Sequence, residues 1–226
     1  MNTFLHLVQK QINKGFIQSQ VPITMKHILL QPTNEIIFNF PVKLSNKKDD
    51  FNKASHLILP GVGSFEVGMA NIIKLGIKDI IIDYVRNKKI PILGICLGMQ
   101  LFATEGYENA KGHENKTVTK GLNLIEGEVI KLKSKSEKLP HIGWNTVYFK
   151  KKNQLNKDLE PNRDFYFVHS YCFKCKNDSE VLGTTNYGST FTSIIKKNNI
   201  YGMQFHPEKS LDKGLTLLKN FLEINA

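Results

Sequence analysis

The chain has 226 residues, of which 41% are hydrophobic, and its 31 basic and 20 acidic residues give a formal net charge of +11. This length supports one sizeable core, so we expect a single domain over residues 1–226. The charge alone suggests a phosphate-rich partner, but among the basic residues only Arg86 and Arg163 are arginines. Diffuse lysine is typical of a solvated surface, and we predict no nucleic-acid partner.

No stretch approaches the roughly 18 consecutive apolar residues of a membrane helix, and the start of the sequence lacks a secretory signal pattern. Three cysteines, an odd number, favour a reducing compartment. We therefore predict a cytoplasmic protein with no membrane partner. Cys172 and Cys175 form a C-x-x-C pair on an expected strand, where residues three apart point to opposite faces. No second pair follows, so neither a metal site nor another cofactor is expected.

The first 53 residues contain two short stretches that fit strands, at 4–8 and 35–40, but no capped helix and no glycine-rich turn. From about residue 54 onward, strand-like and helix-like segments alternate, which predicts an α/β fold with a mostly parallel sheet flanked by helices. The expected elements are a strand at 56–59 that ends at Pro60, helices near 66–75 and 77–88, a buried strand at 90–95 and a helix at 97–105.

The second half of the chain is richer in short strands, which predict a smaller antiparallel sheet. The expected strands lie around 121–133, 144–150, 165–172 and 181–187, and as a hairpin at 190–195 and 200–205. Leucines at positions 211, 215, 218 and 222 have helical spacing and predict a final amphipathic helix.

A candidate nucleophile stands between two glycines in Gly94-Ile95-Cys96-Leu97-Gly98. Cys96 follows the predicted central strand and precedes a predicted helix, which is the cysteine form of a nucleophile elbow. Small neighbours are needed because the turn is tight, and the positive end of a helix favours the reactive thiolate. A small buried cysteine in a tight turn is the alternative interpretation of this segment alone.

A second segment, Gly202-Met203-Gln204-Phe205-His206-Pro207-Glu208, supplies the groups that would activate such a thiol. His206 is the candidate base that takes the thiol proton, and Glu208 is the candidate group that orients the imidazole. Pro207 stiffens the link between them. A lone histidine is more often structural, so the combination with Cys96 carries the prediction of a catalytic triad.

Covalent attack on a carbonyl also needs donors for the developing oxyanion. The backbone N–H of Leu97 is one candidate, and the loop Pro60-Gly61-Val62-Gly63 supplies Val62 and Gly63 as the other. Glycines allow that loop to present a peptide N–H. A simple turn between a strand and a helix is the alternative.

Together these segments resemble the class I glutamine amidotransferases, and within them the glutaminase subunits of imidazole glycerol phosphate synthases. The resemblance covers most of residues 55–226 in the order of the family. It rests on the two segments above and on three others, Leu59-Pro60-Gly61-Val62-Gly63-Ser64-Phe65, Pro140-His141-Ile142-Gly143-Trp144-Asn145 and Tyr166-Phe167-Val168-His169-Ser170-Tyr171. It implies a flavodoxin-like fold and a glutamyl thioester on Cys96, with His206 and Glu208 completing the triad.

The resemblance also implies binding roles. Gln100 and Glu108 match positions that hold glutamine, with Ser170 and Tyr171 at its backbone end. His141, Trp144 and Asn145 would face a (β/α)8-barrel cyclase subunit, to which ammonia passes in a heterodimer for histidine biosynthesis. The resemblance further implies that hydrolysis is nearly silent without that partner. A core aromatic is the alternative for Trp144.

One departure from the family concerns the N-terminus. Family members begin with a strand that runs into Asp-Tyr-Gly-x-Gly-Asn, and residues 1–53 contain no such motif. Either the first βα unit has diverged or the reading frame near the start is altered. Two other functions stay open from the sequence: a paralogous glutaminase that supplies ammonia for amination of a surface sugar, and a binding subunit without turnover.

Overall fold

The computed structural model of the chain describes residues 45–108, 118–134 and 137–224, so the two strands expected at 4–8 and 35–40 lie outside it. The described elements are α2 (Lys48–Phe51), β1 (Leu57–Gly61), α3 (Phe65–Lys74), α4 (Lys78–Arg86), β2 (Ile92–Cys96), α5 (Leu97–Gln100), β3 (Glu105–Gly106), β4 (Thr119–Lys120), β5 (Gly127–Lys131), β6 (His141–Phe149), β7 (Asn162–His169), β8 (Tyr171–Cys175), η1 (Asp178–Glu180), β9 (Val181–Asn186), β10 (Thr190–Lys197), β11 (Ile200–Met203), η2 (Pro207–Lys209) and α6 (Leu211–Leu222).

The described strands form one mixed sheet of 11 strands, with the order β1-β2-β11-β10-β8-β5-β3-β4 and with β9, β6 and β7 branching from β10. Parallel pairing among them joins β1 to β2, β2 to β11 and β3 to β5. The predicted α/β class with flanking helices is confirmed. The antiparallel strands are not a separate sheet, because β10 pairs directly with β11 and continues the parallel strands.

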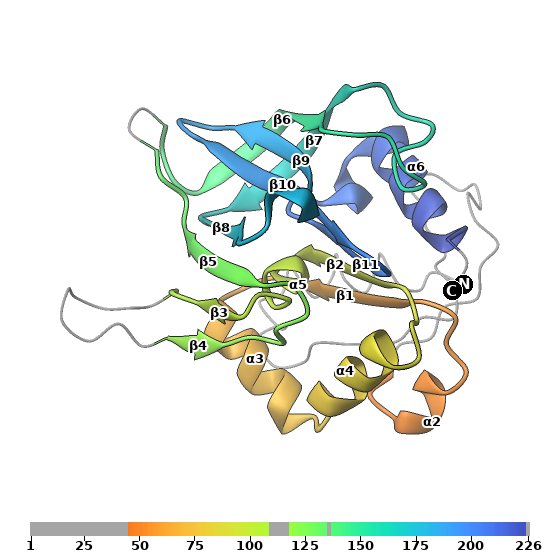
Figure 1. Cartoon of the computed structure of the whole chain (residues 1–226). Helices are drawn as coiled ribbons and strands as arrows, with labels where there is room; N and C mark the ends of the chain where they lie inside the picture. The colour runs from red at the N-terminus through yellow and green to blue at the C-terminus, as the bar shows by residue number, and fades with distance from the viewer. Residues whose placement is uncertain (1–44, 109–117, 135–136, 225–226) are drawn as a thin grey trace.

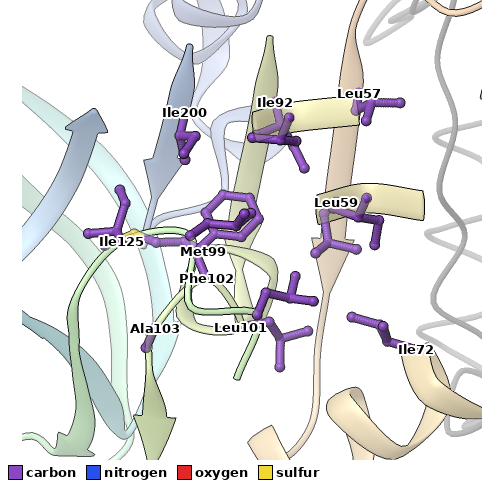
Figure 2. Close-up of a cluster of buried hydrophobic side chains, with 14 of the residues drawn as sticks. Leu57, Leu59, Ile72, Ile92, Met99, Leu101, Phe102, Ala103, Ile125 and Ile200 are labelled. Carbon is purple, nitrogen blue, oxygen red and sulfur yellow. The ribbon is translucent and has the colours of Figure 1, made fainter. Parts of the chain in front are cut away.

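Helices cover the parallel strands on both faces: α3 and α4 lie on one side and α6 on the other (Figure 1). The alternation of side chains along β1 explains this arrangement. Leu57 and Leu59 belong to the core cluster under α3 and α4, whereas Ile58 belongs to the cluster under α6. Figure 2 shows the first of these clusters, where Met99 and Phe102 of the segment after Cys96 pack near Ile92 and Ile200.

The flanking helices follow from ordinary sequence signals. Ser64 caps α3 by accepting a hydrogen bond from the Val67 backbone N–H at 3.4 Å, and a basic residue, Lys74, stands in the last turn. The helix α6 buries Leu215, Leu218 and Leu222 along one face, as the leucine spacing predicts, but Leu211, its first residue, is 70% exposed and does not join that face.

The helix after Cys96 is shorter than the sequence predicts. It ends at Gln100 instead of about residue 105. The carbonyls that would continue it accept backbone N–H groups from the loop 121–125 instead, at 2.9 Å from Leu122 to Leu101 and from Leu124 to Phe102. This loop lies far along the chain, so the local pattern gives no sign of the competition.

Several strand boundaries also differ from the expected ones. The strand expected around 121–133 is shorter, because only Gly127–Lys131 forms β5. The first strand does not stop at Pro60 but runs on to Gly61, which pairs with Cys96. The strand expected at 165–172 is two strands, because the chain breaks pairing at Ser170. The Ser170 carbonyl accepts the Leu132 N–H at 2.8 Å, while β7 pairs with β6 and β8 pairs with β5.

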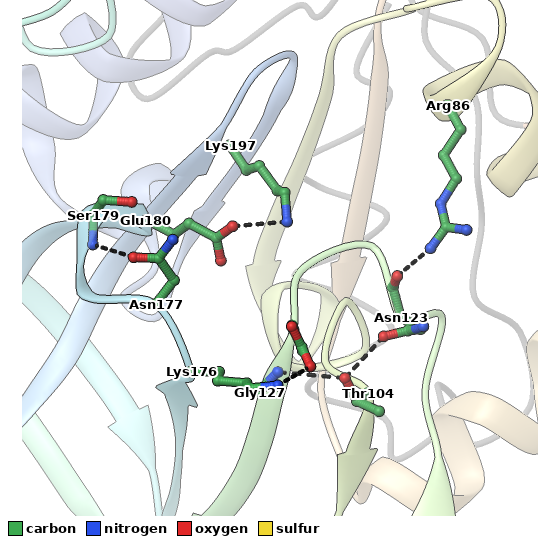
Figure 3. A network of polar contacts seen from close by, with 10 residues as sticks. Arg86, Thr104, Asn123, Gly127, Lys176, Asn177, Ser179, Glu180 and Lys197 are labelled. Carbon is green, nitrogen blue, oxygen red and sulfur yellow. Dashed lines mark hydrogen bonds and ion pairs between the residues drawn. The ribbon is translucent and has the colours of Figure 1, made fainter.

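Polar contacts close the end of the sheet opposite Cys96 (Figure 3). Thr104 donates to the Asn123 side chain at 2.8 Å, and the Arg86 side chain donates to the Asn123 carbonyl. A pocket of about 550 Å³ opens there and includes Arg86 and Lys197 in its lining. Lys197 pairs with Glu180 at 2.7 Å, so these two cations already have protein partners. This pocket is therefore a weaker candidate for chemistry than the Cys96 edge.

Candidate active site

Cys96 stands at the carboxyl end of β2, at the point where the chain turns sharply into α5. Its backbone has φ 53° and ψ −112°, a positive φ that side-chain-bearing residues seldom adopt. β2 lies between β1 and β11, and both neighbours run parallel to it. Strained geometry at the carboxyl edge of a parallel sheet is the arrangement that the nucleophile-elbow prediction requires.

The glycines on either side of Cys96 are required by close backbone contacts. A Cβ at Gly94 would lie 2.6 Å from the Met99 backbone N, and a Cβ at Gly98 would lie 1.7 Å from the Leu59 carbonyl O. Neither neighbour is the end of a flexible side chain, so the chain has to keep glycine at both positions for the turn to form.

His206 approaches the same edge from β11. Met203 pairs with Ile95, so the residues that follow β11 and β2 emerge side by side. The His206 ring Nδ1 lies 2.8 Å from Glu208 Oε1, and Cys96 lies close enough to His206 to raise its pKa, while the Cys96 thiol itself donates to the Val168 carbonyl oxygen at 3.7 Å. The three side chains predicted as a triad therefore meet, although Cys96 and His206 are 110 positions apart in the chain.

The electrostatics of the pair favour a charged imidazole. Burial lowers the pKa of His206, but the sulfur of Cys96 and the carboxylate of Glu208 outweigh burial and raise the pKa to about 10. A protonated His206 beside Cys96 stabilises a thiolate, which is the nucleophilic form of cysteine. The short α5 has a weaker dipole than the expected helix of nine residues, so the imidazolium is the larger source of positive charge at the sulfur.

A glutamine in place of Glu208 tests this account. A folded-state pKa above the unfolded value of 6.5 gives stability that is complete below pH 6.5 and is lost as the pH rises through about 10. Glu208→Gln removes the anion, so we expect the His206 pKa to fall and this loss of stability to be complete at a lower pH. NMR titration of the His206 ring protons in both proteins measures the shift. An unchanged His206 pKa in the variant contradicts the assigned role of Glu208.

Ser210 and Gly214 fix the loop that carries His206 and Glu208. The Ser210 hydroxyl donates to the His206 carbonyl at 2.6 Å and accepts the Tyr166 N–H at 3.0 Å, so it ties this loop to β7. A Cβ at Gly214 would lie 1.9 Å from the Pro207 carbonyl O, which shows how closely α6 packs on the same loop. Neither residue was assigned a role from the sequence.

The predicted oxyanion donors lie on the two segments that adjoin Cys96. Leu97 is the first residue of α5. Val62 and Gly63 directly follow β1, whose last residue, Gly61, pairs with Cys96. Gly63 has φ 106°, a conformation that favours glycine. Oxyanion binding by these groups remains a prediction.

Two of the predicted glutamine contacts come together beside the nucleophile. Gln100 is buried and donates both amide hydrogens, to the Tyr171 carbonyl at 2.8 Å and to Gln204 Oε1 at 2.9 Å. Ser170 precedes Tyr171 at the break between β7 and β8.

Glu108 is the fourth predicted contact. Its carboxylate accepts the backbone N–H of Phe65, the first residue of α3, at 2.5 Å. Burial raises the pKa of its carboxyl group. Whether these four residues bind glutamine remains a prediction.

The expected partner residues on β6 divide between its two faces. Trp144 is 50% exposed and contacts Tyr166 edge to face at 6.1 Å, so the core alternative for Trp144 is wrong. His141 is only 2% exposed, which does not fit the expected direct contact with a partner. Residues 141 and 144 are an odd number of positions apart on a strand, so their side chains point to opposite faces. Asn145 is half-buried and donates to the Asn186 carbonyl at 2.9 Å.

Gln204 is a site residue that sequence reasoning missed. Its side chain is fully buried and its amide donates to Cys96 Sγ at 3.7 Å. A glutamine between Met203 and Phe205 at the end of an apolar strand was the available signal, because buried polar side chains need partners.

Two other features bear on the expected absence of cofactors and membrane segments. Cys172 and Cys175 face different core clusters, and burial raises the pKa of each thiol to about 12. Among the described residues, no three His, Cys, Asp or Glu side chains are grouped as a metal site would need. The described helices include none with the length and apolar character needed to cross a membrane.

Several proteins of named function are similar to this chain in sequence. An imidazole glycerol phosphate synthase subunit HisH 2 from Methanococcus maripaludis is 45% identical over 185 residues, which are 81% of this chain and 88% of that protein. The subunit HisH 1 from Prochlorococcus marinus is 46% identical over 175 residues, 76% of this chain and 80% of the relative. The subunit HisH from Leptospira borgpetersenii is 41% identical over 190 residues, 82% of this chain and 89% of the relative.

Solved structures support the same fold. A crystal structure of a glutamine amidotransferase matches 80% of this chain and 85% of its own with a TM-score of 0.59 at 20% identity. A crystal structure of a glutamine amidotransferase from Thermotoga maritima matches with a TM-score of 0.51 at 18% identity and covers 76% of this chain and 62% of that one.

The family model for glutamine amidotransferase class-I matches residues 13–224. The match begins inside the N-terminal stretch that lacks the expected motif, and it includes every residue of the predicted site. With the Cys96 elbow, the His206 and Glu208 pair and the 41–46% identical relatives, this match shows that the chain belongs to the class I glutamine amidotransferases.

Proposed function

We propose that the chain is the glutaminase subunit of an imidazole glycerol phosphate synthase, acting in histidine biosynthesis. The observation that carries the proposal is the contact of Cys96 with His206 and of His206 with Glu208 at one edge of the sheet. The HisH relatives, which match most of this chain at 41–46% identity, support the choice of enzyme within the family.

The proposed reaction proceeds through a thioester. His206 takes the thiol proton, and the Cys96 thiolate attacks the side-chain amide carbon of glutamine. Leu97 and the loop residues Val62 and Gly63 donate N–H groups to the oxyanion. His206 then protonates the leaving nitrogen, which departs as ammonia. Water, deprotonated by His206, hydrolyses the thioester to glutamate and restores the thiol. On its own the chain is thus a hydrolase, and the ring-forming chemistry belongs to its partner.

The proposed partner is a (β/α)8-barrel cyclase subunit, which receives ammonia in a heterodimer. The apolar surface on β6 supports a protein partner of some kind. Ile142 is 59% exposed, Trp144 50% and Tyr148 46%, and all three lie on one face of the strand because they are an even number of positions apart. Large apolar side chains gathered on one strand face are typical of an interaction surface.

Glutamine hydrolysis with and without the barrel subunit tests the proposal. We expect slow hydrolysis by the chain alone and a large increase on addition of the cyclase subunit of the same organism with its ligand imidazole glycerol phosphate. Some relatives are numbered HisH 1 and HisH 2, so the barrel-type synthase of the surface-sugar alternative serves as the comparison. Activation by only a surface-sugar synthase would assign the chain to the paralogous function, and no hydrolysis with any partner would remove the glutaminase proposal.

Trp144→Ala tests the position of the interface. Truncation of a large exposed aromatic at the centre of an interface typically costs about 2 kcal/mol or more, so we expect Kd for the barrel subunit to rise by about 30-fold. Ile73→Ala is the matched control, since Ile73 is 58% exposed on α3, well away from β6 (Figure 1). Isothermal titration calorimetry measures the Kd of each variant for the barrel subunit. Equal effects of the two substitutions contradict an interface on this face of β6.

A further inference from the structure

A chain of side-chain hydrogen bonds leads from β6 into the core of the molecule. Asn145 Nδ2 lies 3.3 Å from His141 Nε2, and His141 Nδ1 lies 3.0 Å from His169 Nε2. His169 Nδ1 lies 2.9 Å from the Tyr171 carbonyl oxygen. Both histidines are buried, and neither has a part in the proposed triad.

The same carbonyl connects this chain to the nucleophile. Tyr171 O also accepts from Gln100 Nε2 at 2.8 Å, and Gln100 Nε2 donates in turn to Gln204 Oε1 at 2.9 Å. Gln204 Nε2 then donates to Cys96 Sγ at 3.7 Å. A continuous polar path therefore joins a surface strand to the reactive sulfur.

The direction of every bond in the histidine part is determined. A carbonyl only accepts, so His169 Nδ1 carries a proton and donates to Tyr171. Burial lowers the pKa of His141 to about 4 and that of His169 to about 3, so each ring holds a single proton at neutral pH. His169 Nε2 consequently accepts from His141 Nδ1, and His141 Nε2 accepts from Asn145. With one proton arrangement, the path cannot keep its bonds by exchanging donors and acceptors when one end is displaced.

Ring packing holds the first histidine in plane. The His141 ring stacks on Tyr187 with centroids 3.9 Å apart and on Phe167 at 4.8 Å. His141 lies on the inward face of β6, while its neighbour Ile142 and, two residues on, Trp144 are exposed on the outward face. Any movement of β6 therefore moves His141 with it.

We propose that His141 and His169 are positioning residues for the glutaminase reaction, which link the partner-facing strand β6 through Tyr171, Gln100 and Gln204 to the Cys96 sulfur. The positioning of Cys96 follows from contacts within this chain. The coupling to a partner rests on the proposed function, because it requires that the barrel subunit docks on the exposed face of β6.

His141→Phe tests the link with little change in shape. Phenylalanine keeps the stacking on Tyr187 and Phe167 and removes both hydrogen bonds of His141. In the complex with the barrel subunit, supplied with imidazole glycerol phosphate, we expect the glutaminase kcat to fall by about 10-fold, the size of a typical coupling between sites. Synthesis from added ammonia, which bypasses Cys96, should stay at the wild-type rate. A kcat equal to that of the wild type overturns the proposal.

Two further variants separate hydrogen bonding from packing. Phe191→Leu removes ring contacts with both histidines, at 5.9 Å and 5.0 Å, and leaves the hydrogen bonds in place, so we expect wild-type kcat. His141→Gln supplies one donor and one acceptor, and we expect it to recover most of the activity lost in His141→Phe. The proposal is overturned if Phe191→Leu lowers kcat as much as His141→Phe does, or if His141→Gln recovers none of the lost kcat. Either result shows that packing alone matters.

The rate at which iodoacetamide alkylates Cys96, followed by mass spectrometry of its peptide, tests positioning in the chain without its partner. We expect His141→Phe to change this rate by about 5-fold or more relative to the wild type and to Phe191→Leu. If His141→Phe does not fold, Asn145→Ala breaks the first bond at a half-buried position and should change the rate in the same direction. An unchanged rate overturns the positioning role. If the barrel subunit does not activate the wild-type chain, the proposed function is removed. The alkylation rates of Cys96 still decide the positioning role in that case, because they are measured without the partner.

Discussion

Replacement of Cys96 by alanine is expected to abolish glutamine hydrolysis while synthesis from added ammonia by the complex proceeds at the wild-type rate. The substitution removes the only atom of the triad that forms a bond to the substrate, so hydrolysis should fall by at least about 10⁴-fold. Ammonia enters the pathway after the thioester step and does not need the sulfur. The measurement is glutamate release and product formation by the same complex, supplied first with glutamine and then with an ammonium salt.

Cys175→Ala is the matched control for this experiment. Burial raises the pKa of the Cys175 thiol to about 12, with Glu180 and Asp178 adding to the effect, so this cysteine stays protonated near neutral pH. We expect its replacement to leave hydrolysis within about two-fold of the wild type, since it lies on β8 and packs against the core cluster under α3 and α4, whereas Cys96 belongs to the other cluster. Persistence of glutamine hydrolysis in Cys96→Ala removes the assignment of the nucleophile.

Gly98→Ala is expected to have the largest effect on stability. The new Cβ would lie 1.7 Å from the Leu59 carbonyl O and 2.7 Å from its carbon, so β1 and α5 have to separate. Overpacking against backbone that cannot move away costs about 3 kcal/mol. Because the same contact holds the turn at Cys96, activity should be lost even under conditions where the variant is folded. Urea unfolding followed by circular dichroism gives the stability.

Gly68→Ala gives the comparison for Gly98→Ala. A Cβ at Gly68, within α3, would meet side-chain methyl groups of Leu101 and Leu97 at 3.1–3.2 Å, which are flexible ends. Alanine also favours a helix over glycine by up to about 1 kcal/mol, so the net change should be small. If Gly98→Ala is no less stable than Gly68→Ala, the close approach of α5 to β1 is not as described.

The sequence predicts the catalytic elements well because their signals lie within short segments of the chain. The strand before Cys96, the helices α3, α4 and α6, and the α/β class all follow from apolar periodicity and from glycines that flank a turn. The pairing of Cys96 with His206 could be inferred only by combining two motifs, and the parallel register of β2 with β11 confirms that the two segments end at the same edge.

The predictions that failed depend on contacts between distant segments. α5 stops at Gln100 because the loop 121–125 takes the carbonyls that would continue the helix. His141 is buried because β6 turns that face of the strand toward His169, and nothing in a short motif tells which face of a strand is covered. Gln204 has a visible signal as a polar residue in an apolar strand, but its partner Gln100 lies on another element.

The proposed mechanism requires above all that the Cys96 sulfur carries the glutamyl group. The most direct measurement is mass spectrometry of the complex quenched in acid during turnover with glutamine, followed by digestion. We predict a glutamyl adduct on the peptide that contains Cys96, which disappears when glutamine is exhausted. Hydrolysis that continues with the adduct on another residue, or with no adduct at all under conditions that preserve thioesters, contradicts the central claim.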